Sequence, residues 1–252
     1  MSNNILNSTT KGVETIEFHH PKGNSLPRYL LDELATAIEH AGINSKIKVI
    51  KLKSKGTTFC AGASFDELLA ITNDNAANEF FSGFGRLIES IKNCPKFVIA
   101  QIQGKAVGGG VGIIAACDYA IATKQAGIKL SELSIGLGPF VIASVVIRKI
   151  GLSAFSTLAI HSENWQSAAW AYQTGLFNDL ANNVDELEVK TSELCASLAG
   201  YSSEAMKKIK ELLWEEYDDL PNIHKKRARV SGKLSQTELT QSILLGFKKI
   251  SR

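Results

Sequence analysis

The sequence lacks the features that mark several large classes of protein. It contains only four cysteines and no Cys-x-x-Cys pair, so we expect free thiols in a reducing compartment. Its histidines, cysteines and acidic residues do not show the spacing of a metal site. No apolar run approaches the length of a membrane span, and the first residues lack a signal-peptide pattern. We therefore expect a cytoplasmic protein with no bound metal and no membrane partner.

A strong net charge and two familiar catalytic loops are also absent. The formal net charge of +3 is too small to indicate a nucleic-acid partner, and the basic run His224–Arg229 is interpreted as a solvated helix face. The sequence has neither a Gly-x-x-x-x-Gly-Lys-Ser/Thr phosphate loop nor a Gly-x-Ser-x-Gly nucleophile elbow. A partial dinucleotide fingerprint at Gly110–Ala115 is rejected, because residues Gly104–Gly109 separate it from the preceding strand.

A glycine-rich stretch between Phe97 and Asp118 carries most of the functional information. It predicts a buried strand at 97–103, a loop with three consecutive glycines at 108–110, and a helix of small residues. The first N–H groups of a helix have no internal acceptors, and glycine leaves them unobstructed. Such a site can hold a phosphate, a carboxylate or the oxyanion of a reaction intermediate.

The order of the predicted elements indicates an α/β fold. Strands and helices alternate to about residue 200, after which strand patterns disappear. The strands are predicted at 13–18, 46–53, 97–103, 119–123 and 128–130, and the helices at 28–41, 64–71, 80–93, 153–160, 166–174 and 184–199. Further helices are predicted at 203–217, 223–233 and 238–250. We therefore divide the chain into a core at 1–200 and a helical region at 201–252.

Two loops of small residues favour the oxyanion over the other anions. Cys60-Ala-Gly-Ala63 follows one predicted strand and Val107-Gly-Gly-Gly110 follows the next. If neighbouring parallel strands carry these loops, their N–H groups can converge on a single oxygen and form an oxyanion hole. The alternative is that the glycines only allow strand and helix to pack closely.

Five motifs follow one another in an order that is typical of one enzyme family. They are Phe59-Cys-Ala-Gly-Ala-Ser-Phe65, Gly104-x-Ala-Val-Gly-Gly-Gly110, Cys117-Asp118, Glu132-Leu-x-Ile-Gly-Leu137 and Ala168-x-x-Ala171-x-x-x-Gly-Leu176. Over about residues 12–200 the chain resembles the enoyl-CoA hydratase/isomerase (crotonase) family. The resemblance implies a crotonase-like spiral of ββα units with a C-terminal all-helical trimerisation region. It also implies a homotrimer or dimer of trimers, an acyl-CoA thioester substrate, and no cofactor, since CoA is part of the substrate.

The resemblance assigns roles to individual residues. Ala63 and Gly109 match the positions whose N–H groups bind the thioester carbonyl in the family. Lys248 and Lys249 are candidates for meeting a CoA phosphate across a subunit interface, although a solvated helix end is the alternative. Further residues are expected to contact the substrate or CoA, namely Ser64, Phe65, Asp66, Gly108, Gly110 and Phe140.

The resemblance also implies two glutamates in a typical hydratase, and this sequence has one of them. Glu132 matches the glutamate that follows the Cys-Asp pair, in a loop between apolar runs where partial burial would raise its pKa toward acid–base duty. Gly112 occupies the other position. One carboxylate can carry out hydration as a syn addition, whereas moving a double bond from one carbon pair to the next needs only one carboxylate.

These observations predict an enzyme that adds water to, or removes water from, the α,β double bond of an enoyl-CoA. Leu130-Ser-Glu-Leu133 together with Gly112 resembles family dehydratases, which makes 3-methylglutaconyl-CoA a candidate substrate. A double-bond isomerase is the alternative within the family, and a non-catalytic acyl-CoA-binding protein is the alternative from another class. Candidate walls of the acyl pocket are Phe80, Phe81, Phe84, Phe140 and Val141.

Overall fold

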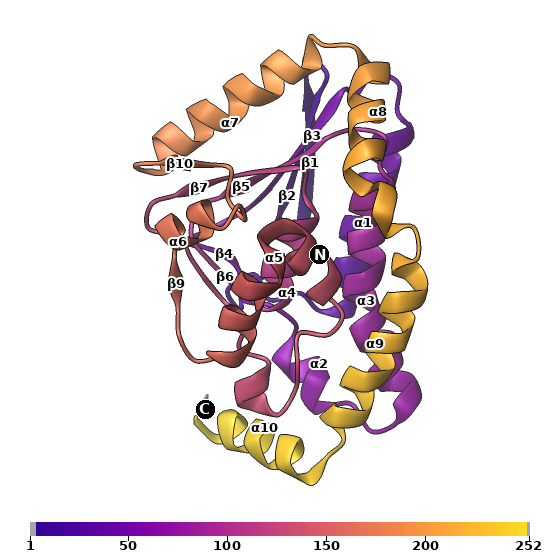
Figure 1. Cartoon of the computed structure of the whole chain (residues 1–252), viewed down its shortest axis with the longest axis vertical. Helices are drawn as coiled ribbons and strands as arrows, with labels where there is room; N and C mark the ends of the chain where they lie inside the picture. Colours follow the sequence, from indigo (N-terminus) through magenta and orange to yellow (C-terminus); the bar gives the residue numbers. More distant parts are fainter. Residues whose placement is uncertain (1–3, 251–252) are drawn as a thin grey trace.

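The chain folds around two β-sheets, which Figure 1 shows in a computed structural model that describes residues 4–250, with side chains described through residue 246. The larger sheet has six strands in the order β1-β2-β3-β5-β7-β10, and only the β1–β2 pair is antiparallel. Their bounds are β1 Ile5–Thr10, β2 Val13–Phe18, β3 Val49–Ser54, β5 Val98–Ile102, β7 Tyr119–Thr123 and β10 Asp179–Ala181.

The smaller sheet repeats the order of the larger one. Each of β3, β5 and β7 is followed by a short strand of the four-stranded sheet β4-β6-β8-β9, in which β4, β6 and β8 are parallel. Their bounds are β4 Thr58–Cys60, β6 Lys105–Val107, β8 Gly127–Lys129 and β9 Gln166–Ser167. A helical segment follows each pair of strands, so the chain winds through successive ββα units. This confirms the predicted α/β spiral.

Helices cover both faces of the larger sheet. Strands β3 and β5 are buried on both faces, as expected for parallel strands inside an α/β fold. Val49 and Ile99 face helix α7 (Val184–Ala199), whereas Ile50 and Leu52 face the main core. On that core side lie α1 (Arg28–Ile43), α3 (Asp74–Asn93) and α4 (Gly109–Ala116), with the short α2 (Phe65–Leu69) between the first two along the chain.

The C-terminal region is entirely helical and packs back onto the core. It consists of α8 (Ser203–Trp214), the 3₁₀ turn η2 (Glu215–Tyr217), α9 (Leu220–Ser235) and α10 (Glu238–Ile250). Helix α9 lies along α3, where Gly85 contacts His224 and Gly232 contacts Ala77. Figure 1 shows α8 and α9 running down one side of the molecule and α10 crossing its base.

Helix α5 (Ala143–Ile160) is long and apolar enough to cross a membrane by length and composition alone. Its backbone breaks at Gly151 (φ 76°, ψ 163°), and its first half is buried against α4. The remaining elements are η1 (Leu133–Ile135) and α6 (Ala168–Gln173).

Five strands were not predicted from the sequence, namely β1, β4, β6, β9 and β10. Strand β1 has a polar, largely exposed sequence and forms only because it pairs with β2 at the edge of the sheet. Strands β4, β6 and β10 have three residues each, too few for a periodic pattern. The segment at 166–174 was predicted as helix, but its first two residues are strand β9, and the helix begins after Ser167, whose hydroxyl caps Trp170 N–H.

Candidate active site

The two loops of small residues lie side by side because β4 and β6 are parallel neighbours. A side-chain carbon on Gly62 would lie 3.1 Å from Val107 O and 4.0 Å from Gly109 N, so the loops are in contact. Among the described residues, the Ala63 N–H and the Gly109 N–H have no hydrogen-bond acceptor. Two backbone donors are therefore available at adjacent strand ends, as the oxyanion prediction requires.

Glycine is needed in the second loop for two separate reasons. Gly108 adopts φ 52° and ψ −118°, a conformation that side chains disfavour, and this bend exposes the start of α4. At Gly109 a side-chain carbon would lie 2.1 Å from the Phe84 ring, so only glycine lets the helix start approach α3. The ring of Phe84 thereby lies directly beside the second donor.

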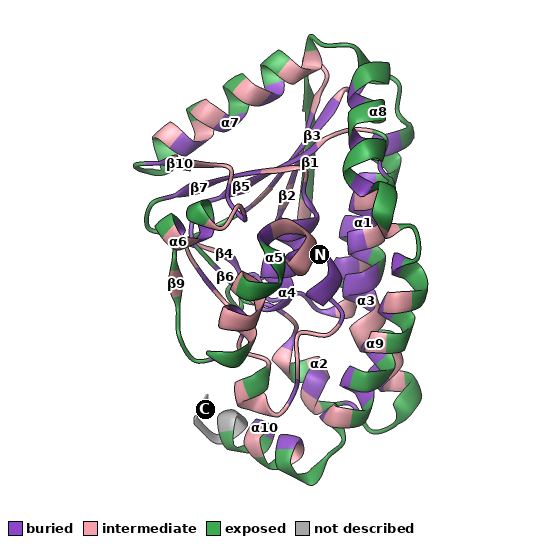
Figure 2. Ribbon diagram, viewed as in Figure 1, coloured by how far each residue is buried: buried purple, intermediate pink, exposed green. Residues whose placement is uncertain are grey.

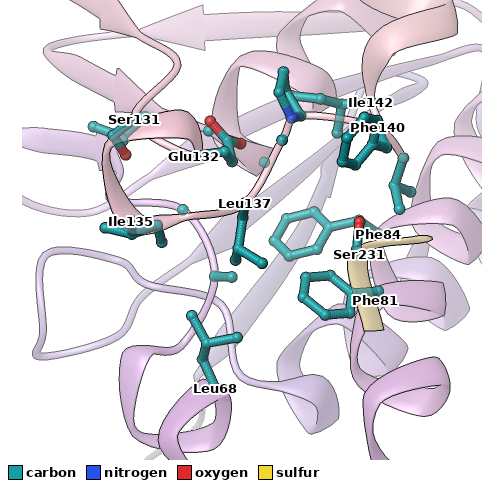
Figure 3. Close-up of a pocket in the computed structure, with 18 of the residues that line it drawn as sticks. Leu68, Phe81, Phe84, Ser131, Glu132, Ile135, Leu137, Phe140, Ile142 and Ser231 are labelled. Atoms are coloured by element: carbon teal, nitrogen blue, oxygen red, sulfur yellow. The ribbon is translucent and has the colours of Figure 1, made fainter. Parts of the chain in front are cut away.

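Glu132 stands between β8 and η1, close to these donors. A side-chain carbon on Gly108 would lie 2.7 Å from its Oε1. Its Oε2 is fully buried and has no hydrogen-bond partner among the described residues, although the residue as a whole is only partly buried. Burial raises the pKa of Glu132 from 4.5 to about 7, and a backbone N–H opposes this shift. Figure 3 shows the carboxyl group directed into the pocket.

The loop that carries Glu132 is tied to the last helix of the same chain. Leu137 N–H donates to Glu132 O (2.9 Å), which closes the turn around η1. Thr240 of α10 is completely buried, and its hydroxyl donates to Gly136 O (3.0 Å) within that turn. Helix α10 therefore holds the loop in place through a single side chain that the sequence patterns gave no reason to select.

An isoleucine occupies the space beside Gly112. A side-chain carbon at Gly112 would lie 2.3 Å from Ile142 Cγ2, so the position has no room for the second glutamate of the family pattern. Among the described residues that line the pocket, Glu132 is the only acidic one. The site therefore contains one carboxylate, and an aliphatic side chain stands where a second would be expected.

These groups share a cavity of about 340 Å³. Of the predicted site residues, it is lined by Ala63, Phe65, Gly108, Gly109, Glu132 and Phe140. The candidate walls Phe80, Phe81, Phe84 and Val141 line it as well. Residues that sequence reasoning missed complete the lining, among them Leu68, Ser131, Leu137, Ile142 and Ser231. Ser131 and Leu137 lie within the quoted motifs and Leu68 follows one closely, whereas Ile142 and Ser231 come from segments outside them. No local pattern marks these side chains as part of the pocket lining.

Three residues predicted to contact the substrate or CoA do not line this cavity, and their role stays a prediction. Ser64 caps helix α2, its hydroxyl accepting from Glu67 N–H (3.4 Å). Asp66 is exposed and pairs with Lys22. Gly110 packs against Cys60, whose thiol is buried with its pKa raised to about 12.

The side chains of Lys248 and Lys249, the candidates for a CoA phosphate contact, lie outside the described residues. No group of three or more metal-ligating side chains occurs in the described part of the chain.

Comparisons with known proteins agree with this geometry. The family model for enoyl-CoA hydratase/isomerase matches residues 8–248. A probable enoyl-CoA hydratase of Bacillus subtilis is 29% identical over 203 residues, which are 80% of this chain and 78% of the relative. A mitochondrial Δ(3,5)-Δ(2,4)-dienoyl-CoA isomerase of Mus musculus is 28% identical over 143 residues, 52% of this chain and 44% of the relative.

A solved structure shows the same fold over nearly the whole chain. The enoyl-CoA hydratase of Bacillus halodurans superposes with a TM-score of 0.90 at 21% identity, covering 97% of this chain and 100% of that structure.

The contact between Gly112 and Ile142 predicts a coupled pair of mutations. Gly112→Ala should destabilise the protein by about 1–3 kcal/mol through overpacking, and Ile142→Ala by about 2–5 kcal/mol through a cavity. In the double variant the new methyl group enters the space that Ile142 leaves. In urea unfolding, the double variant should therefore lose at least about 1 kcal/mol less unfolding free energy than the sum of the losses in the two single variants. Additive losses would show that the two side chains do not share this space.

The raised pKa of Glu132 predicts a pH-dependent change in stability. Between pH 4.5 and about 7, the folded protein keeps a proton that the unfolded chain has released. The stability contributed by the neutral carboxyl group is therefore complete below pH 4.5 and is lost as the pH rises through 7. Glutamine carries no such proton, so the free energy of unfolding of Glu132→Gln does not fall in this way. Relative to that of the parent protein, it should rise by up to about 3 kcal/mol between acidic pH and about pH 8. Urea unfolding across pH measures this gain, and a constant difference would contradict the raised pKa.

Proposed function

Because the chain belongs to the enoyl-CoA hydratase/isomerase family, we propose that it adds water to, or removes water from, the α,β double bond of an enoyl-CoA. One observation carries the proposal. The buried, unpartnered Oε2 of Glu132 shares a pocket with the free N–H groups of Ala63 and Gly109. A proton-transfer group and a site for negative charge are thus held together in a cavity large enough for an acyl group.

The two backbone donors bind the thioester carbonyl oxygen. Bonding of the water oxygen to the β-carbon, or removal of the α-proton in the dehydration direction, gives a thioester enolate, which concentrates negative charge on that oxygen. Donors that are already fixed by β4, β6 and the start of α4 need no reorganisation when this charge appears. They stabilise the enolate more than the neutral carbonyl, and so they lower the barrier instead of merely tightening substrate binding.

Glu132 moves the protons in both directions. With a pKa of about 7, its carboxyl group is present in both protonation states near neutral pH. In hydration the carboxylate takes a proton from water as the water oxygen bonds to the β-carbon. The same group then delivers a proton to the α-carbon on the same face, which completes a syn addition. Dehydration follows these steps in reverse.

The candidate substrate 3-methylglutaconyl-CoA rests on the resemblance of Leu130–Leu133 and Gly112 to family dehydratases. Its β-carbon carries a methyl branch, so loss of the hydroxyl from a tertiary carbon needs less help from a second carboxylate. The contact of Ile142 with Gly112, which leaves Glu132 as the only acid in the described lining, supports a substrate with this property.

Double-bond isomerisation is the second candidate, and the same contact favours it. Moving a proton from the α- to the γ-carbon requires one carboxylate and no bound water. The aliphatic surface that Ile142 provides beside Gly112 suits a reaction from which water is excluded.

Substituting Glu132 tests the mechanism. Glu132→Gln should reduce turnover by at least about 10²-fold, because the amide cannot exchange the proton. Glu163→Gln, on an exposed loop outside the pocket, is the matched control and should leave turnover unchanged. Retained activity in Glu132→Gln would remove this residue from the mechanism.

The absorbance of the conjugated enoyl thioester separates the candidate reactions. Loss of absorbance from a 2-enoyl-CoA indicates hydration, and a gain from a 3-enoyl-CoA without a hydroxyacyl product indicates isomerisation. If neither changes while acyl-CoA raises the thermal stability by mass action, the protein only binds its ligand.

We also propose that the chain forms a homotrimer or a dimer of trimers. Apolar side chains on α5 and α8 support this, because Leu152 and Leu212 are 66% and 68% exposed in the single chain. Figure 2 shows exposed positions along both helices. Sedimentation should give three or six times 27.3 kDa. Leu212→Lys should lower this mass, whereas Ile43→Lys, at the exposed end of α1, should not. A monomeric parent protein would contradict the proposal.

A further inference from the structure

Helix α9 contributes one polar side chain to the pocket lining, Ser231. Arg227 and Ser231 are four residues apart, so they lie on one face of the helix, about 6 Å apart along its axis. Neighbouring positions of α9, such as His224 and Ala228, pack on α3 instead. The aromatic side chains of Phe81 and Phe84, from α3, lie beside this part of the lining.

Ser231 presents a hydroxyl group to an otherwise apolar part of the cavity. The residue is 1% exposed and lines the pocket. Within the described residues its hydroxyl makes no hydrogen bond, whereas that of Ser235, one turn later, donates to Gly232 O (2.7 Å). Figure 3 shows Ser231 beside Phe81 and Phe84, across the pocket from Glu132. A buried hydroxyl without a partner is unfavourable unless a ligand supplies one.

Arg227 lies one turn before Ser231 on the same face of α9, and although it does not itself line the cavity, it is hydrogen-bonded to Phe140, which does. Its Nη1 donates to Ser144 Oγ (2.6 Å) and to the backbone oxygen of Phe140 (3.3 Å), whose ring lines the pocket. No acidic side chain in the described part of the chain lies within ion-pair distance of it, in contrast to Arg28 and Arg86, which both pair with Asp32. Burial alone lowers the pKa of the Arg227 guanidinium. Its Nε and Nη2 remain free to bind an anion.

We propose that Arg227 and Ser231 form a subsite for a carboxylate at the far end of the acyl group. The substrates are then enoyl thioesters of dicarboxylic acids. This inference rests on the proposed function, because Ala63 and Gly109 must hold the thioester for the acyl chain to extend toward α9. A carboxylate there would accept hydrogen bonds from the guanidinium and from the serine hydroxyl, which are the charge-assisted bonds that planar anions favour.

Two thioesters that differ only at the acyl terminus test the subsite. Glutaconyl-CoA ends in a carboxylate and 2-pentenoyl-CoA ends in a methyl group, while the CoA phosphates are common to both. The parent protein should have the higher kcat/KM for glutaconyl-CoA. Arg227→Met and Ser231→Ala should each reduce that value by about 10- to 100-fold and change the value for 2-pentenoyl-CoA by less than about threefold. Arg229→Met, on an exposed position of α9, is the matched control and should change neither.

Binding of saturated thioesters tests the same subsite without turnover. Glutaryl-CoA should raise the melting temperature more than pentanoyl-CoA in the parent protein, and Ser231→Ala should abolish the difference. Equal stabilisation by the two thioesters, or equal losses for both in the variants, would overturn the subsite. Preferential binding of glutaryl-CoA without any turnover would instead refute the proposed reaction and leave the subsite supported. A loss shared by both thioesters and by CoA alone would assign Arg227 to a CoA phosphate.

Discussion

The parallel pairing of β4 with β6 is the constraint on which the site depends. It sets two chain segments, more than forty residues apart, at the same edge of the smaller sheet, so that Ala63 and Gly109 present free N–H groups side by side. The glycines keep this edge open. Gly108 supplies a backbone bend that other residues disfavour, and Gly109 allows the Phe84 ring to approach the start of α4. Charge stabilisation is therefore built from backbone geometry and needs no mobile side chain.

Packing around α4 also decides how many carboxylates the site can have. Every residue of α4 is buried, so any side chain at Gly112 would have to displace a neighbour. That neighbour is Ile142, which lies against the helix where the family pattern has a glutamate. In the proposed mechanism all proton transfer then falls to Glu132, whose Oε2 lacks a partner among the described residues and whose pKa of about 7 suits both directions of transfer. Because Ile142 fills the space beside Gly112, the proposed reaction is limited to steps that one carboxyl group can perform.

Local sequence predicted the parts of the site that depend on backbone conformation. The two glycine loops were recognisable because turn chemistry leaves a signature in the sequence, whereas Glu132 was selected by the family resemblance. Ile142 and Ser231 were not recognisable, since they reach the pocket through tertiary packing and resemble ordinary core or helix residues. Ser64 and Asp66, which were predicted to contact the substrate or CoA, do not line the pocket. They are close to Ala63 in sequence, yet α2 begins between them and turns one into a helix cap and the other toward solvent.

The helical region at 201–252 contributes more than the subunit contacts predicted for it. Helix α9 supplies Ser231 to the pocket wall, and α10 supplies Thr240 to the turn that carries Glu132. Gly136 adopts φ 78°, and a side-chain carbon there would lie 2.4 Å from the Thr240 hydroxyl, so turn and helix fit only with glycine at this position. In the proposed mechanism the spiral core fixes the two N–H donors for the oxyanion, whereas α9 lines the acyl end of the pocket and α10 holds the turn that carries Glu132. Changes in α9 can therefore alter which acyl group is accepted while the strand ends that bind the thioester stay as they are.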